Sequence, residues 1–172
     1  MNPGELLAQL RKDSLFKQWQ KQHLQAYLTH FFAQIDGEFT LLSPWEIGFF
    51  NPATNKMTIF MQENTIWIIK PEDDVFKKEA DHVEELHVEA VKGGLEKVKP
   101  LFLEHLPQFF PAEVFGNGFI ILQMWPKKAV WNATLITKTV KFANLKIDAE
   151  TGEVSDHQMV DLVQKGDSLK ER

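Results

Sequence analysis

Apolar alternation interrupted by a tight corner is the feature that most constrains the fold of this chain. Apolar and polar residues alternate over 143–147, stop at Asp148-Ala149-Glu150-Thr151-Gly152, and resume at Val154. A two-residue period is typical of strands, and an aspartate-led corner ending in glycine is typical of the turn between antiparallel strands. Gly152 can adopt the positive φ that closes such a corner, and Asp148 can accept a hydrogen bond from the backbone two residues on. The segment therefore predicts a β-hairpin within a longer β region over 129–160.

The same alternation predicts antiparallel sheet in both halves of the chain. Strands are expected over 45–50, 57–61 and 65–70, and again over 119–125, 129–140, 142–147 and 154–160. Apolar residues at helical spacing predict helices over 3–12, 14–35 and 95–110. Ile66-Trp67-Ile68-Ile69 is apolar on both faces, which predicts a central strand or one covered twice. We therefore predict an α+β fold in which helices pack on curved antiparallel meanders.

The chain of 172 residues is long enough to form one compact α+β domain spanning 1–172 without disulfides. Within it, two helix-plus-sheet halves over 1–70 and 95–163 are separated by a polar connector over 71–94. Segments 47–57 and 144–154 each consist of a strand, an Asn- or Asp-led corner and a returning strand. This likeness suggests a diverged internal duplication. The alternative is one domain whose hairpins share turn chemistry.

Composition excludes several classes of function. A net charge of −5 provides no basic surface for a phosphate backbone, so we expect no nucleic-acid partner. The absence of cysteine excludes disulfides, thiolate nucleophiles and cysteine-ligated metals. No apolar run approaches the roughly 20 residues of a membrane span, and the first residues lack the pattern of a signal peptide. We therefore expect a soluble, cytoplasmic protein that does not engage membranes.

The titratable residues form no recognisable catalytic or metal-binding pattern. His82 and His87 are five residues apart and would not share a helix face, so we interpret them as part of a solvated connector. His30 and His105 are expected near the ends of two helices, where an imidazolium interacts favourably with the helix carbonyls. We predict no cofactor, no metal and no catalytic residue.

Tryptophans are the most informative candidates for binding. The chain has 5 Trp and 14 Phe, and four of the tryptophans fall in or beside predicted strands. A small curved sheet has difficulty covering so many rings, and an uncovered ring would line a groove or a dimer face. On the strand over 129–140, Trp131 is expected on the dry face and Asn132 on the wetter one. The predicted ligand-binding residues are Trp125, Trp131, Asn132 and Trp67.

The last third of the chain resembles a known family. A helix over 95–110, then strands, then Leu145-Lys146-Ile147-Asp148-Ala149-Glu150-Thr151-Gly152-Glu153-Val154 is similar to the PepSY family, small α+β modules found in protease propeptides and envelope proteins. The family typically ends with an apolar strand, Asp-Ala-x-Thr-Gly-x-Val and a final strand. The resemblance implies a curved antiparallel sheet on a helix that binds or inhibits a protein rather than catalysing a reaction. Such modules are usually exported, whereas the start of this chain shows no export signal.

We expect a non-catalytic binding or interaction module whose partner is a protein or a small apolar ligand. One alternative is a small enzyme with its site inside a helix-capped curved sheet, using Asn132, His105 or His157. Another is a structural homodimer joined through sheet edges. An aromatic-lined sheet face or a bare sheet edge would favour the binding module.

Overall fold

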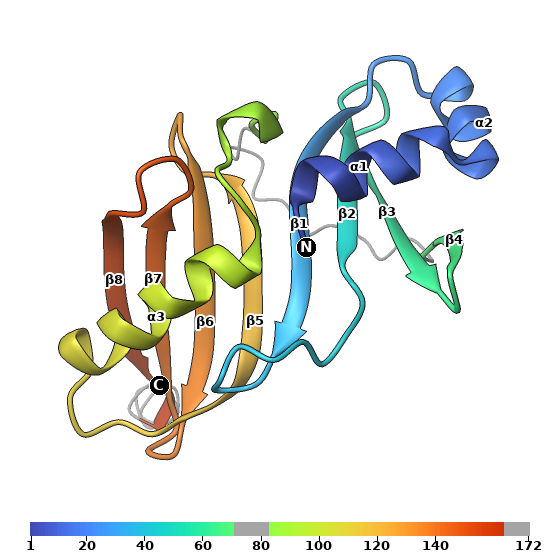
Figure 1. Cartoon of the computed structure of the whole chain (residues 1–172). Coiled ribbons are helices and arrows are strands. Elements are labelled where there is room, and N and C mark those ends of the chain that lie inside the picture. The colour runs from blue at the N-terminus through green and yellow to red at the C-terminus, as the bar shows by residue number, and fades with distance from the viewer. Residues whose placement is uncertain (71–82, 164–172) are drawn as a thin grey trace, which may run out of the picture.

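The computed structural model describes residues 1–70 and 83–163, which form three α-helices, a short 3-10 helix and one antiparallel sheet (Figure 1). The first half contains α1 (Pro3–Lys12), α2 (Ser14–Gln22), β1 (Tyr27–Ile35), β2 (Glu46–Asn51), β3 (Lys56–Glu63) and β4 (Ile66–Ile69). The second half contains the 3-10 helix η1 (Val88–Ala90), α3 (Leu95–Phe109), β5 (Phe115–Met124), β6 (Ala129–Thr137), β7 (Lys141–Asp148) and β8 (Val154–Asp161). None of the helices in these residues is long and apolar enough to cross a membrane.

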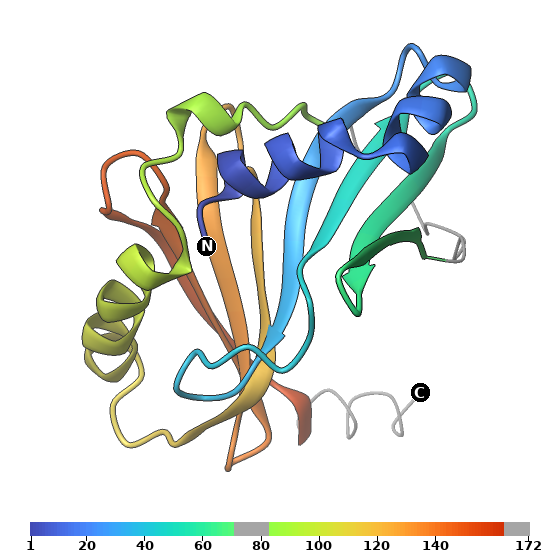
Figure 2. The same cartoon turned by 45° about the vertical axis from the view of Figure 1, so that its right-hand side comes forward.

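The eight strands form a single sheet in the order β4-β3-β2-β1-β5-β6-β7-β8. Each half contributes a meander of four strands, and the two meanders meet where β1 pairs antiparallel with β5. Figures 1 and 2 show α1, α2 and α3 on the same side of this sheet. The predicted α+β class, with helices packed on antiparallel sheet, is confirmed. Each half is thus helix followed by four strands, the arrangement that a duplication would produce; the duplication itself stays a prediction.

The core lies between the helices and the sheet. Phe16 of α2 contacts Phe49 and Phe60, with ring centroids 5.2 and 5.3 Å apart, and Phe102 of α3 stacks on Phe39 at 4.9 Å. All of these rings are almost fully buried. Burying a phenylalanine side chain contributes roughly 1.5–3 kcal/mol, so this aromatic layer accounts for much of the helix–sheet packing.

The structure places a strand where the sequence predicted the second half of a long helix. α2 begins after its N-cap Asp13, as predicted, but ends at Gln22, and Tyr27–Ile35 forms β1. Phe31 and Ile35 are four residues apart, a spacing that places side chains on one face of a helix and also of a strand. Pairing with β2 on one side and β5 on the other decides in favour of the strand. His30 therefore does not lie at a helix terminus.

Two further predictions concern the strands at the start and end of the sheet. β4 is an edge strand, with Ile66 66% exposed, so the prediction of a central or doubly covered strand is wrong. The hairpin between β7 and β8 forms as predicted: Gly152 has φ of 78°, and Asp148 Oδ1 accepts from the N–H groups of Glu150 (2.8 Å) and Thr151 (3.0 Å). Asn51 accepts similarly from the N–H of Ala53 (3.0 Å) at the β2–β3 corner.

Candidate functional site

The sheet face opposite the helices, here called the open face, carries no helix among residues 1–70 and 83–163. Because side chains alternate across a strand, the paired register identifies which residues share this face. One row crosses all eight strands. It runs through Ile68, Met61, Glu46, Phe32, Ile121, Asn132, Lys146 and Asp156. The row is largely apolar over its first five positions and polar over the last three.

The apolar part of the open face centres on the junction between the two meanders. Phe32 of β1 stacks on Phe119 of β5 with ring centroids 5.7 Å apart, and Ile121 of β5 lies directly opposite Phe32 in the register. Ile59 and Met61 of β3 lie on the same face, beyond Gly48 and Glu46 of β2. All five apolar side chains are only partly buried, although Phe32, Phe119 and Ile121 lie on the two central strands of the sheet. The open face thus presents rings and branched side chains that the described helices leave uncovered.

The polar part of the open face is a hydrogen-bonded network around Asn144 on β7. The Asn144 amide nitrogen lies 2.6 Å from Asn132 Oδ1 and 2.8 Å from Thr134 Oγ1. The ammonium of Lys146 donates to Asn144 Oδ1 at 2.7 Å and pairs with Asp156 at 3.3 Å. These bonds fix the side chains of β6, β7 and β8 on this face relative to one another.

Trp125 joins this network from the β5–β6 turn. Its ring lies 4.8 Å from the Lys146 ammonium, which is a cation–π distance. Lys146 is only 8% exposed, even though it lies on the open face, where Trp125, Asn144 and Asp156 surround its ammonium. The structure therefore brings the predicted site residues Trp125 and Asn132 together around Lys146.

Charges on the open face are largely compensated within the chain. Glu46 pairs with Lys70 at 2.6 Å, as Asp156 does with Lys146. His30 lies on this face beside Gly48, with Nδ1 2.8 Å from the Thr29 hydroxyl. Burial lowers the pKa of His30 to about 4, against a smaller raising effect of Glu46, so the ring is neutral at pH 7. The face offers apolar and amide groups rather than a net charge.

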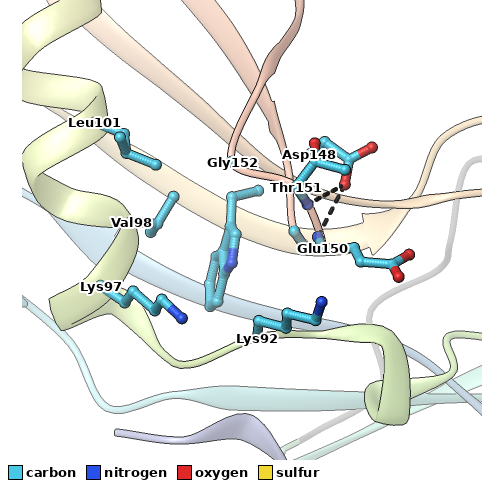
Figure 3. Close-up of a pocket in the computed structure, with 10 residues that line it drawn as sticks. Lys92, Lys97, Val98, Leu101, Asp148, Glu150, Thr151 and Gly152 are labelled. Carbon is cyan, nitrogen blue, oxygen red and sulfur yellow. Dashed lines mark hydrogen bonds between the residues drawn. The ribbon is translucent and has the colours of Figure 1, made fainter.

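Trp131 lies on the other side of the sheet, in a cavity of about 280 Å³ between the start of α3 and the β7–β8 turn (Figure 3). Val98, Leu101 and Gly152 contribute apolar walls, and Lys92 and Lys97 lie at the rim. Asp148 also lines it. Burial works to raise its pKa, but the N–H groups of Thr151 and Glu150 and the Lys128 ammonium outweigh burial and leave the pKa of Asp148 below its usual value. The cavity combines an aromatic floor with a charged rim.

Trp67 is the fourth predicted site residue, and it lies apart from the other three. It lines a separate cavity with Trp45 and Leu6 beneath α1. Trp67 is 7% and Trp131 2% exposed, so both are core residues that also reach cavities. Their assignment as ligand-binding residues stays a prediction.

The three side chains proposed for an enzyme do not converge. Asn132 is on the open face, whereas His157 pairs opposite Leu145 on the helix side, with its ring 4.1 Å from Phe109. His105 on α3 places Nδ1 3.3 Å from Gln108. Among residues 1–70 and 83–163, no group of three or more His, Asp and Glu side chains could hold a metal ion. His82 lies outside the described residues.

Several side chains of these sites were not predicted from the sequence. Phe32 was assigned to a helix, and Phe119 and Ile121 were treated as ordinary strand residues. The available signal was the adjacent apolar pairs Phe31-Phe32 and Ile120-Ile121, which make a strand apolar on both faces. No sequence pattern identified Lys92 and Lys97 as site residues, because they come close to Trp131 only when α3 and the segment before it pack on the sheet.

Comparison with known proteins identifies a similar fold and no family. No family model matches the chain, and the search of curated proteins finds no match. The structure is similar to the crystal structure of a "putative lipoprotein" from Clostridium difficile 630, with a TM-score of 0.51 and 9% sequence identity. The alignment covers 87% of this chain and 97% of that chain. At such low identity the likeness concerns the fold alone.

Proposed function

We propose that this chain is a non-catalytic binding module that docks a protein partner on the open face of its sheet. The observation that carries the proposal is the partly exposed apolar surface formed by Phe32, Phe119 and Ile121, on a face that the described helices leave free. Soluble proteins rarely expose a contiguous apolar patch larger than a few hundred Å² unless it is used for interaction.

The composition of the open face indicates the chemistry of the partner. Glu46 and Asp156 are paired with lysines, so electrostatic attraction to a strongly charged molecule has little support. Aromatic rings provide large contact area with few rotatable bonds, as they do at the centres of protein interfaces. The amide of Asn132 and the hydroxyl of Thr134 add hydrogen-bonding groups beside the rings. The partner is therefore a protein surface with apolar side chains at its centre and backbone groups at its rim.

The PepSY resemblance supports the same function. The residues that carry it form the β7–β8 hairpin, which supplies Asn144, Lys146 and Asp156 to the open face. The resemblance implies a module that binds or inhibits a protein, and we extend that role to this chain as part of the proposal.

The proposal can be tested without knowing the partner, by selecting peptides that bind the full chain. Random peptides displayed on phage are selected on the immobilised chain, and the enriched peptides are synthesised and their affinity measured. Ile121→Lys places a charge at the centre of the apolar surface, and Leu103→Lys, at a 42% exposed position on α3, is the matched control. Folding of both variants is checked by near-UV circular dichroism. The position of Ile121 is partly exposed, so the ammonium of the introduced lysine can reach solvent.

Binding at least tenfold weaker to Ile121→Lys, with unchanged binding to Leu103→Lys, supports the open face as the docking site. Peptides that bind both variants equally, or a library that yields no binder, contradict it. Sedimentation of the unmodified chain distinguishes the homodimer. A dimer that Ile121→Lys converts to a monomer would mean that the open face is covered by a second copy, and the proposal would be replaced.

A further inference from the structure

We propose a second site, independent of the open face: the cavity under Trp131 binds a small organic anion with an apolar body, such as an aryl carboxylate. The site lies on the helix side of the sheet, where α3 begins next to the β7–β8 turn. It shares no lining residue with the apolar surface of the open face, so it can be occupied with or without a protein partner there.

The indole N–H of Trp131 has room for an acceptor from a ligand. Trp131 is only 2% exposed, and its N–H has no hydrogen-bond acceptor among residues 1–70 and 83–163. Among the described residues, Nε1 of Trp45 is the indole nitrogen that is both inaccessible to solvent and without a hydrogen-bond partner; that of Trp131 is not in this group. The Trp131 nitrogen is therefore open to the cavity that its side chain lines. Buried indole N–H groups usually have a partner, so an acceptor atom of a ligand would complete this one.

Two ammonium groups at the rim of the cavity favour an anion. Lys92 and Lys97 line the cavity, and neither has an ion-pair partner among the described residues. The nearby Glu96 carboxylate is held by the N-terminal ammonium at 2.7 Å, and Asp148 by Lys128 at 3.6 Å, so neither forms an ion pair with Lys92 or Lys97. Figure 3 shows the Glu150 side chain directed away from Val98 and Leu101. Asp148 and Glu150 line the cavity on the side of the β7–β8 turn, so a ligand carboxylate would bind on the side of Lys92 and Lys97.

The N-terminus of α3 lies beside the cavity but already carries a carboxylate. Gly94, the N-cap of this 15-residue helix, provides no side-chain oxygen to its first turn. Glu96 of the first turn supplies one instead and accepts from the N–H of Gly94 at 3.2 Å, so its negative charge offsets the helix dipole there. The preference for an anion therefore rests on the two lysines and the indole N–H.

The walls and the size of the cavity define the rest of the ligand. Val98, Leu101 and the indole ring of Trp131 give the cavity its apolar lining. The volume of about 280 Å³ is just below the 300–1,000 Å³ typical of pockets for drug-sized molecules, so the body is about the size of a single ring. The anionic group would accept from the indole N–H and pair with Lys97 or Lys92, while the ring packs against α3.

The test uses the ¹⁵N-labelled full chain and phenylacetate as the probe. The indole N–H resonance of Trp131 is identified by its loss in Trp131→Phe and is then followed by NMR during titration. Acetate lacks the ring, phenylacetamide lacks the charge, and 2-phenylethylamine reverses the charge. The decisive variant is Lys92→Gln/Lys97→Gln, both positions being exposed, and Lys12→Gln/Lys138→Gln is its charge-matched control.

We expect phenylacetate to shift this resonance saturably, and the affinity to fall about tenfold in Lys92→Gln/Lys97→Gln and to stay unchanged in the control. The other three probes should bind much more weakly. The inference is overturned if the resonance does not respond to phenylacetate, if the amine or amide binds equally well, or if both double variants lose the same affinity. Ile121→Lys should bind phenylacetate normally, so failure of this site and failure of the open-face proposal can be told apart.

Discussion

The ammonium of Lys146 lies 4.8 Å from the ring centre of Trp125, and the ring covers the lysine on an otherwise open sheet face. A cation–π contact contributes about 0.5–1 kcal/mol when exposed and about 2 kcal/mol when desolvated. We expect Trp125→Ala to lower the free energy of unfolding by about 1–2 kcal/mol and Trp125→Phe to recover part of this. Urea unfolding measures both. In a Lys146→Met background the loss should shrink, and an equal loss there would show that the contact is ordinary packing.

Asn144 is the centre of the polar network on the open face. Removing its amide leaves Lys146 with one fewer acceptor and Asn132 and Thr134 without their donor. Leaving buried polar groups unpaired costs about 1–3 kcal/mol, so Asn144→Ala should reduce the free energy of unfolding by that amount. Gln158→Ala is the control, since Gln158 pairs opposite Asn144 but is exposed. Equal effects of the two substitutions in urea unfolding would contradict the network.

Gly152 closes the β7–β8 hairpin with φ of 78°, and a Cβ at this position would approach Leu101 Cδ1 at 3.3 Å. Gly152→Val should therefore lower the free energy of unfolding by about 1–2 kcal/mol, because a β-branched residue is strained at positive φ. Glu153→Val, in the same turn and exposed, should change it much less. A melting temperature of Gly152→Val equal to that of the unmodified chain would show that this position does not require a residue without a Cβ.

His30 makes stability depend on pH in a defined window. The unfolded chain takes up a proton near pH 6.5, whereas burial lowers the pKa of His30 in the folded chain to about 4. The unfolded state therefore binds more protons between these values, and the free energy of unfolding falls as pH drops from 6.5 toward 4, by roughly 3 kcal/mol in total. Urea unfolding at a series of pH values measures this.

His30→Gln should flatten the dependence above about pH 4.5, and the exposed His87→Gln should leave it unchanged. Carboxylates with lowered pKa values, such as Asp36, act at lower pH and do not obscure the window. If the free energy of unfolding of His30→Gln still falls between pH 6.5 and about 4.5, another group causes the pH dependence.

Local patterns predicted the second meander well and the first strand badly, for a physical reason. The segment over 119–160 alternates regularly between turn residues, and β5 to β8 follow it closely. In β1, Phe31 and Ile35 satisfy both a helical and a strand period, and the choice is made by β2 and β5, which are distant in sequence. Sequence could nominate Trp125 and Asn132 separately. Their meeting at Lys146 required the register of three strands and the return of the β5–β6 turn.

The pairing of β1 with β5 sets the order in which this protein can fold. Each meander is built from neighbouring hairpins that can form locally, but Phe32 must find Ile121 across a long stretch of chain before the eight strands become one sheet. Closing this long loop costs conformational entropy, and the free energy is recovered only when the apolar contacts between β1 and β5 form. The slowest step of refolding should therefore be the joining of two preformed hairpin arrays, and destabilising the Phe32–Phe119 stack should slow refolding more than changes at β4 or β8 do.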